Sequence, residues 1–177
     1  SGLIVLPGSF NPLHEGHKKL AAAAQKVLSK PLLFELSVKN VDKADISREE
    51  VFARIVQFQT YANIAVTYAP RFVQKAEIFP GATFTIGFDT AERIVSPKYY
   101  SSKEDMIETV STIGQFGCNF LVACRAKGEK GYGQGSRIFT LDDLEIESRI
   151  KGLFRPIPPE LFRLDISSSE IREKAKK

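Results

Sequence analysis

Short apolar runs alternate with segments of helical spacing along the chain, and this alternation restricts the fold more than any other feature of the sequence. The apolar runs cover residues 3–6, 32–38, 64–68, 82–86, 120–124 and 162–164. Strands that alternate with helices form βαβ units and a mostly parallel sheet. The sequence therefore predicts an α/β fold: a Rossmann-like, doubly wound, mostly parallel sheet with helices on both faces. The first run should be buried on both faces, because it is apolar throughout.

Helical spacing is clearest over residues 47–61, where Ser47 and Glu50 also have the spacing of a capping box. The expected apolar face of this helix consists of Val51, Ile55, Phe58 and, as a further candidate, Phe52. Residues 127–136 (KGEKGYGQGS) are rich in glycine but lack the GxxxxGK[ST] order of a P-loop, so a surface loop is the favoured interpretation.

The length of 177 residues and the hydrophobic content of 43% suit one well-buried core, so we expect a single domain over residues 1–177. The chain opens on Ser1 and Gly2 without a methionine, which looks like a tag remnant and leaves room for a preceding segment or domain. The formal net charge of +4 reflects a mild, dispersed excess of 25 basic over 21 acidic residues. This excess suits an anionic small ligand and does not indicate nucleic acid as a partner.

Cys118 and Cys124 are too few to staple the fold and do not form a CxxC pair, so we expect them to be reduced and partly buried. No apolar stretch approaches the roughly 20 residues that a membrane-spanning helix needs, and no signal-like amino terminus is visible. These features predict a cytoplasmic protein without a membrane partner.

The two histidines of the chain, His14 and His17, both fall in residues 8–17 (GSFNPLHEGH), between the first predicted strand and a helix-forming segment. In open α/β sheets ligands bind beyond the carboxyl ends of the strands, and a helix amino terminus there offers N–H groups to an anion. Gly16 allows close approach of a ligand to the backbone, and Gly8 allows a tight turn. The histidine spacing places both rings on one face of a helix, so we predict a phosphate site. The spacing differs from HExxH and the chain has no third histidine, which argues against metal ligation.

A second run, residues 165–172 (DISSSEIR), opens the last predicted helix with serine caps and adds Arg172 within its first turns. Serines before a helix are usually caps alone, but a guanidinium beside a helix amino terminus favours an anion. With one such motif near each end of the chain, the sequence predicts a polyphosphate held between them.

Residues 8–17 resemble the G-[ST]-F-[DN]-P-x-H-x-G-H signature of the nucleotidylyltransferase superfamily, and residues 166–172 resemble its I-S-S-T-x-I-R signature. Between them, residues 86–90 (IGFDT) look like the G-x-D segment of the nicotinamide and nicotinate mononucleotide adenylyltransferases. Residues 121–125 (LVACR) look like the V-x-x-R strand end of the same enzymes. The resemblance spans nearly the whole chain and is most specific at its ends.

This resemblance implies transfer of AMP from ATP to a phosphate-bearing acceptor with release of pyrophosphate, and nicotinamide or nicotinate mononucleotide is the favoured acceptor. A phosphate nucleophile is already an anion, so the reaction needs alignment and positioned cations rather than a general base. By resemblance, the catalytic residues are His14, His17 and Arg172, with His17 at the α-phosphate. The implied nucleotide-binding residues are Gly8, Ser9, Phe10, Gly16, Gly87, Asp89, Ile166, Ser167, Ser168 and Ser169. Mg²⁺ is expected to bridge the phosphates, with phosphate and water as its main ligands.

The acceptor site is marked less clearly. Lys39 and Asn40 follow the second predicted strand, and Arg125 ends another strand. Because these positions lie at the carboxyl edge of the sheet, we expect them to bind the acceptor, with Lys39 the first choice for its phosphate and Arg125 an equal candidate. The alternative interpretation of Lys39 and Asn40 is that they are solvated loop residues. Nicotinamide-type members often stack the pyridine ring on tryptophan, and this chain has none. A phenylalanine or tyrosine would take its place.

Several alternatives stay open. Pantetheine-phosphate adenylyltransferase and cytidylyltransferase activities use the same chemistry, and a nucleotide-binding module would bind ATP without releasing pyrophosphate. An aminoacyl-tRNA synthetase fragment shares the HxGH logic, but the chain is too short for an anticodon-binding region and has no KMSKS-like motif. The sequence leaves homo-oligomerisation open.

Overall fold

The computed structural model describes residues 2–39, 45–127 and 137–164. Its strands are β1 (Ile4–Pro7), β2 (Leu32–Ser37), β3 (Ile64–Thr67), β4 (Thr83–Gly87), β5 (Asn119–Lys127), β6 (Arg137–Phe139), β7 (Phe154–Pro156) and β8 (Arg163–Leu164). Its helices are α1 (Glu15–Leu28), α2 (Arg48–Ile55), α3 (Phe72–Ile78), α4 (Phe88–Ile94), α5 (Lys103–Gln115) and α6 (Ser148–Lys151). Short 3₁₀ turns are η1 (Val56–Phe58), η2 (Pro97–Tyr99) and η3 (Leu141–Asp143).

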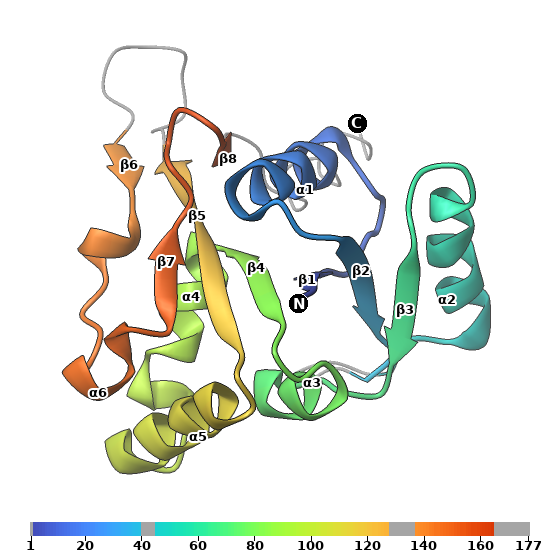
Figure 1. Ribbon diagram of the computed structural model, residues 1–177. Helices are drawn as coiled ribbons and strands as arrows, with labels where there is room; N and C mark the ends of the chain where they lie inside the picture. Colours follow the sequence, from blue (N-terminus) through green and yellow to red (C-terminus); the bar gives the residue numbers. More distant parts are fainter. Residues whose placement is uncertain (1, 40–44, 128–136, 165–177) are drawn as a thin grey trace.

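The strands form one sheet in the order β3-β2-β1-β4-β5-β6, with β7 and β8 also paired to β5 (Figure 1). The pairs are parallel except for β5 with β6. The strand order runs outward in both directions from β1 and β4, as in a doubly wound sheet. The predicted α/β, Rossmann-like class is therefore confirmed. Strands β6 and β7 were not predicted, because each has three residues, one of them an arginine, and so neither forms an apolar run.

Alternate side chains of the central strands enter two separate cores. Ile4 and Leu6 pack with α1, α2 and η1 on one face of the sheet. Val5 lies in the other core, among residues of β4, β5 and of helices α3, α4 and α5. The first strand is thus buried on both faces, as predicted, and helices cover both faces of the sheet.

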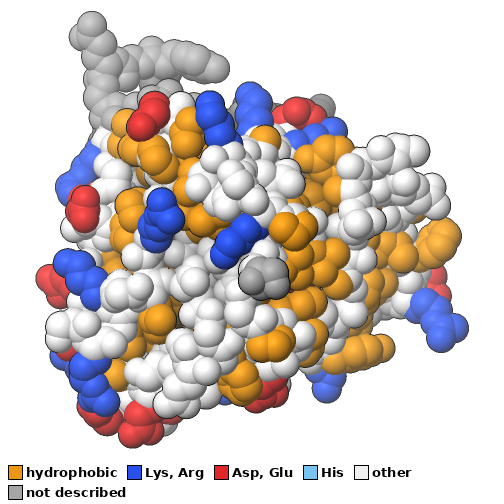
Figure 2. Space-filling view, viewed as in Figure 1, with side chains coloured by type: hydrophobic (Ala, Val, Ile, Leu, Met, Phe, Trp, Pro, Cys, Tyr) orange, Lys and Arg blue, Asp and Glu red, His pale blue; other side chains and the backbone are white. Residues whose placement is uncertain are grey.

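Helix α2 begins with the predicted capping box, in which Ser47 Oγ accepts from the Glu50 N–H at 3.2 Å and the Glu50 carboxylate accepts from the Ser47 N–H at 3.3 Å. Phe58 reaches the core through η1, but Phe52 is 64% exposed, so its predicted place on the apolar face is wrong. Successive helical residues are rotated by about 100°, which turns Phe52 away from the face that Val51 occupies. Figure 2 shows apolar side chains gathered on the side of the molecule where α2 and β3 lie.

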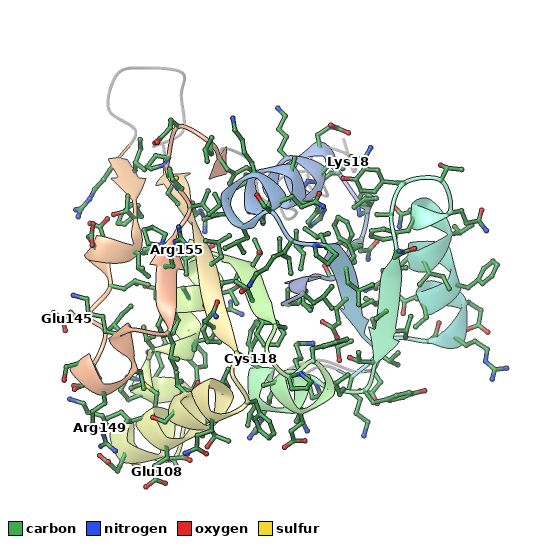
Figure 3. All side chains as sticks on the ribbon, viewed as in Figure 1. Lys18, Glu108, Cys118, Glu145, Arg149 and Arg155 are labelled. Carbon is green, nitrogen blue, oxygen red and sulfur yellow. The ribbon has the colours of Figure 1, made fainter. Side chains whose placement is uncertain are left out.

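Cys118 and Cys124 are both buried, more deeply than predicted, and no disulfide joins them. Cys118, labelled in Figure 3, precedes β5 at the end of that strand opposite to Arg125. The Cys124 thiol donates to the Phe162 carbonyl at 3.2 Å. Among the helices of the described residues, none has the length and apolar character that crossing a membrane requires.

Candidate active site

The sheet opens between the carboxyl ends of β1 and β4. The ladder that joins these two strands ends at Val5 and Phe84. By contrast, β1 stays in register with β2 as far as Pro7, and β4 stays in register with β5 as far as Gly87. The two central strands therefore separate where the strand order reverses, which is the place where open α/β sheets bind ligands. A pocket of about 360 Å³ lies at this opening.

The pocket draws residues from β1, α1, α3, β4, α4 and β5 into one wall. It brings together seven of the residues predicted from sequence: Gly8, His14, Gly16, His17, Gly87, Asp89 and Arg125. Phe72, Lys75 and Thr85 are among the lining residues that were not predicted from sequence. Motifs that lie far apart in the sequence thus share one cleft.

The turn between β1 and α1 is held by backbone and aromatic contacts. The Gly8 N–H donates to the Glu35 carbonyl of β2 at 2.9 Å. The Phe10 ring is fully buried and packs edge-on against His17, with 5.1 Å between ring centroids. A Cβ added at Gly8 would lie 2.6 Å from the Phe10 ring, so close packing requires glycine there. The side chain of Phe10 therefore supports His17 from the core and does not line the pocket.

His14 and His17 cap the amino terminus of α1 with their ring nitrogens. His14 is the N-cap, and its Nδ1 accepts from the Gly16 N–H at 3.1 Å. His17 Nδ1 accepts from the His14 N–H at 3.2 Å, which completes a capping box made of two histidines. The two rings lie side by side, with centroids 3.8 Å apart. Both rings line the pocket, although His14 precedes the helix and does not share a helical face with His17.

These caps determine which ring nitrogen carries a proton. A nitrogen that accepts a hydrogen bond has no proton of its own, so a neutral ring capped through Nδ1 carries its proton on Nε2. Burial, and to a smaller extent the positive charge that His14 would carry when protonated, lower the pKa of His17 from 6.5 to about 4. In the ligand-free protein, His17 is therefore a neutral Nε2–H donor at neutral pH. For His17, the expected positioned cation is thus replaced by a neutral donor.

Asp89 and Arg125 meet at the edge of the pocket. Asp89 lies in the first turn of α4, directly after Gly87 and Phe88, and its carboxylate forms an ion pair with the Arg125 guanidinium of β5. Both side chains remain partly exposed, at 52% for Asp89 and 29% for Arg125. A Cβ added at Gly87 would meet no atom within 4 Å, so any side chain there would project into open space beside the pocket.

The remaining predicted residues lie elsewhere. Lys39 is exposed and does not line this pocket, and its carbonyl accepts from Ser37 Oγ at 2.8 Å. Ser9 is exposed, and its carbonyl accepts from Arg54 at 3.1 Å. Asn40, Ile166, Ser167, Ser168, Ser169 and Arg172 fall outside the described residues, as does most of the glycine-rich segment 127–136. Lys18, next to His17, places its ammonium over the Tyr61 ring at 5.3 Å and is also not a lining residue (Figure 3).

A buried ion pair lies beside the pocket and was missed from sequence. Lys75 Nζ of α3 donates to both carboxylate oxygens of Glu35, at 2.8 and 2.7 Å, and to the Ala69 carbonyl at 2.7 Å. Glu35 also accepts from Thr67 Oγ1 at 2.5 Å. Burial lowers the pKa of Lys75, and the adjacent Glu35 carboxylate opposes that change. The sequence does contain one indication of this ion pair: Glu35 is the sole charged residue in the apolar run 32–38.

Comparison with known proteins gives one family. Residues 5–174 match the family described as cytidylyltransferase-like, which covers nearly the whole chain. No curated protein matches the chain significantly.

Proposed function

The chain belongs to the cytidylyltransferase-like family of nucleotidyltransferases, and we propose that it transfers AMP from ATP to a phosphate-bearing acceptor and releases pyrophosphate. Nicotinamide or nicotinate mononucleotide is the acceptor that we favour. The proposal rests above all on the His14–His17 capping box, which presents ring donors to a pocket at the reversal of the strand order.

The proposed reaction is an in-line displacement at the α-phosphorus of ATP. An oxygen of the acceptor phosphate attacks the α-phosphorus, its new P–O bond forms, and the bond to the pyrophosphate oxygen breaks. The attacking oxygen is already an anion, so no protein base is required. Negative charge grows on the non-bridging oxygens of the α-phosphate, where a preorganised N–H donor lowers the barrier. We assign this donor to Nε2 of His17, with His14 beside it on the triphosphate.

Other roles follow the resemblance. Gly87 would contact the nucleoside, and the serines of 167–169 with Arg172 would hold the β- and γ-phosphates. Lys39 and Asn40 stay proposed ligands of the acceptor phosphate. By resemblance, Asp89 would contact the nucleoside and Arg125 would contact the acceptor. Because the two side chains form an ion pair, both roles concern the same corner of the pocket.

Mg²⁺ enters the proposal with the triphosphate. Within residues 2–39, 45–127 and 137–164, no cluster of three His, Cys, Asp or Glu side chains could hold a metal ion. Asp89 is the carboxylate that lines the pocket, and it is engaged by Arg125. The side chains of the described residues thus do not fit a Mg²⁺ ion held by the protein alone. Phosphate and water oxygens would complete the coordination shell of the ion. We assign no step to a protein-held metal.

A pyrophosphate-release panel tests the proposal. ATP and CTP are each combined with nicotinamide mononucleotide, nicotinate mononucleotide and phosphopantetheine at the same Mg²⁺ concentration, and a His17→Asn variant is the matched control. We expect release with ATP and a pyridine mononucleotide, lost in the control. Release with CTP alone, or with phosphopantetheine alone, would replace the proposed reaction by a cytidylyltransferase or a pantetheine-phosphate adenylyltransferase. ATP binding without release in any combination would make the protein a nucleotide-binding module.

A further inference from the structure

The Asp89–Arg125 ion pair presents hydrogen-bond donors and acceptors together at the edge of the pocket. The guanidinium has five N–H donors, and the contact with Asp89 uses its Nη1. The carboxylate engages Arg125 through Oδ2, and Oδ1 is the second acceptor of the same side chain. Both groups are partly exposed at the pocket wall. A ligand that reaches this corner therefore meets an acceptor and donors side by side.

The pair is held in place by the strand that carries it. Arg125 of β5 is registered with Phe139 of β6 on one side and with Leu164 of β8 on the other. Phe88, which precedes Asp89, packs against Phe139 with 5.6 Å between ring centroids. A preorganised pair discriminates between ligands more sharply than one that must be assembled on binding.

The cationic side chains that line the pocket within the described residues are already paired with carboxylates. Two side-chain cations of the described residues line it, Lys75 and Arg125, and each is paired with a carboxylate. The buried ring of His17, capped through Nδ1, is a neutral donor at neutral pH. A second carboxylate entering this corner would meet Asp89 and would compete with it for Arg125. It would lose hydration without gaining an unpaired cation among the described residues that line the pocket.

We propose that Asp89 acts with Arg125 on the acceptor, in place of the nucleoside contact that the resemblance gives it, and that the pair selects an acceptor whose head group is a primary carboxamide and rejects one whose head group is a carboxylate. A carboxamide has one C=O, which accepts from Arg125, and an NH₂ group, which donates to Asp89. Within the proposed function, on which this inference rests, the acceptor is then nicotinamide mononucleotide rather than nicotinate mononucleotide. Specificity arises mainly from repulsion of the wrong head group.

Equilibrium binding tests the inference without turnover. Dissociation constants of the two mononucleotides are measured by titration calorimetry on the full chain in the absence of ATP. The ligands share ribose and phosphate, so these contributions cancel in the ratio. We expect the amide to bind at least about tenfold more tightly, the scale of one unfavourable charge contact at a binding site. Equal binding, tighter binding of the acid, or binding of neither ligand would overturn the inference.

Asp89→Asn gives a second test, with a signature that loss of structure would not produce. The change removes the repulsive charge, keeps the shape, and releases Arg125 for the carboxylate. We expect the amide-to-acid preference to fall to about one or to invert. The matched control is Glu104→Gln, which breaks the Glu104–Arg149 ion pair away from the pocket and should leave the preference unchanged. An unchanged preference in Asp89→Asn, or the same change in Glu104→Gln, would refute the role of the pair.

These outcomes separate the inference from the proposed function. Absence of pyrophosphate release with either acceptor would refute the transferase, while the binding ratio would still report on the head group. Release with nicotinate mononucleotide at an equal or higher kcat/KM would keep the transferase and refute the carboxamide preference.

Discussion

His17 combines two tasks on two ring nitrogens, and substitution can separate them. Nδ1 accepts the His14 N–H at the start of α1, whereas Nε2 is the donor that we assign to the transferring phosphate. His17→Asn places an amide oxygen near the position of Nδ1 and has no atom near that of Nε2. His17→Ala removes both nitrogens. Activity should therefore fall in both variants, and stability should fall mainly in the alanine variant.

The expected magnitudes follow from the contacts. Loss of one preorganised donor to a developing charge costs about two to three orders of magnitude in kcat. Loss of the cap costs about 1 kcal/mol, to which His17→Ala adds the lost contact with the Phe10 ring. For a chain of this size, 1 kcal/mol lowers Tm by roughly 2–4 °C. His17→Asn should therefore melt close to the wild type and be as inactive as His17→Ala.

Two assays on the same samples check this separation: pyrophosphate release at saturating ATP and acceptor, and thermal unfolding followed by circular dichroism. If His17→Asn keeps near-wild-type turnover, Nε2 is not the phosphate donor. If His17→Asn melts as low as His17→Ala, the Nδ1 cap is not what the ring contributes to folding. A Tm collapse parallel to the activity loss in both variants would make His17 structural.

The lowered pKa of His17 adds a pH signature to the same variants. The folded-state pKa is about 4 and the ordinary value is 6.5, so below pH 6.5 the unfolded chain takes up a proton that the folded chain does not bind. Stability from this group is complete above pH 6.5 and is lost as the pH falls toward 4, with about 2 kcal/mol gone by pH 5. Urea unfolding of the wild type and His17→Asn between pH 7.5 and 5 should show a steeper decline in the wild type. Parallel declines would refute the buried neutral ring.

Three further outcomes are expected. If Lys39 binds the acceptor phosphate, Lys39→Ala should raise the KM for the acceptor and leave that for ATP nearly unchanged, whereas no effect on either would transfer this role to Arg125. Thr85→Val should raise the free energy of unfolding by about 1 kcal/mol in urea titrations, because the buried Thr85 hydroxyl has no partner among the described residues. A lower free energy of unfolding would mean that the hydroxyl does have a partner, and Thr83→Val on the same strand is the control. Lys75→Met should lower the free energy of unfolding by about 3–5 kcal/mol, because it leaves the buried Glu35 carboxylate unpaired. Adding Glu35→Leu should restore most of this free energy, and a double variant as unstable as Lys75→Met would contradict the pairing.

Features that depend on near neighbours could be predicted from the sequence. Apolar runs and helical spacing were enough for the α/β class, and the Ser47–Glu50 capping box needs only a three-residue spacing. The position of residues 8–17 after the first strand was enough to predict that His14 and His17 open a helix beside the sheet edge. Phe52 shows the limit of this reasoning, because neighbouring apolar residues on a helix do not all face the core.

The tertiary structure alone determined which distant groups touch and which protons they keep. Asp89 and Arg125 are 36 positions apart and meet because β4 and β5 are neighbours, whereas Lys75 reaches Glu35 over 40 positions because α3 packs against the face of the sheet on which Glu35 lies. Packing on the opposite face of the sheet buries Phe10 beside His17, and burial gives His17 its low pKa, since desolvation depends on all surrounding atoms. Local sequence thus determines hydrogen-bonding partners within a turn, while strand order and burial determine the charge state and the chemistry of the pocket.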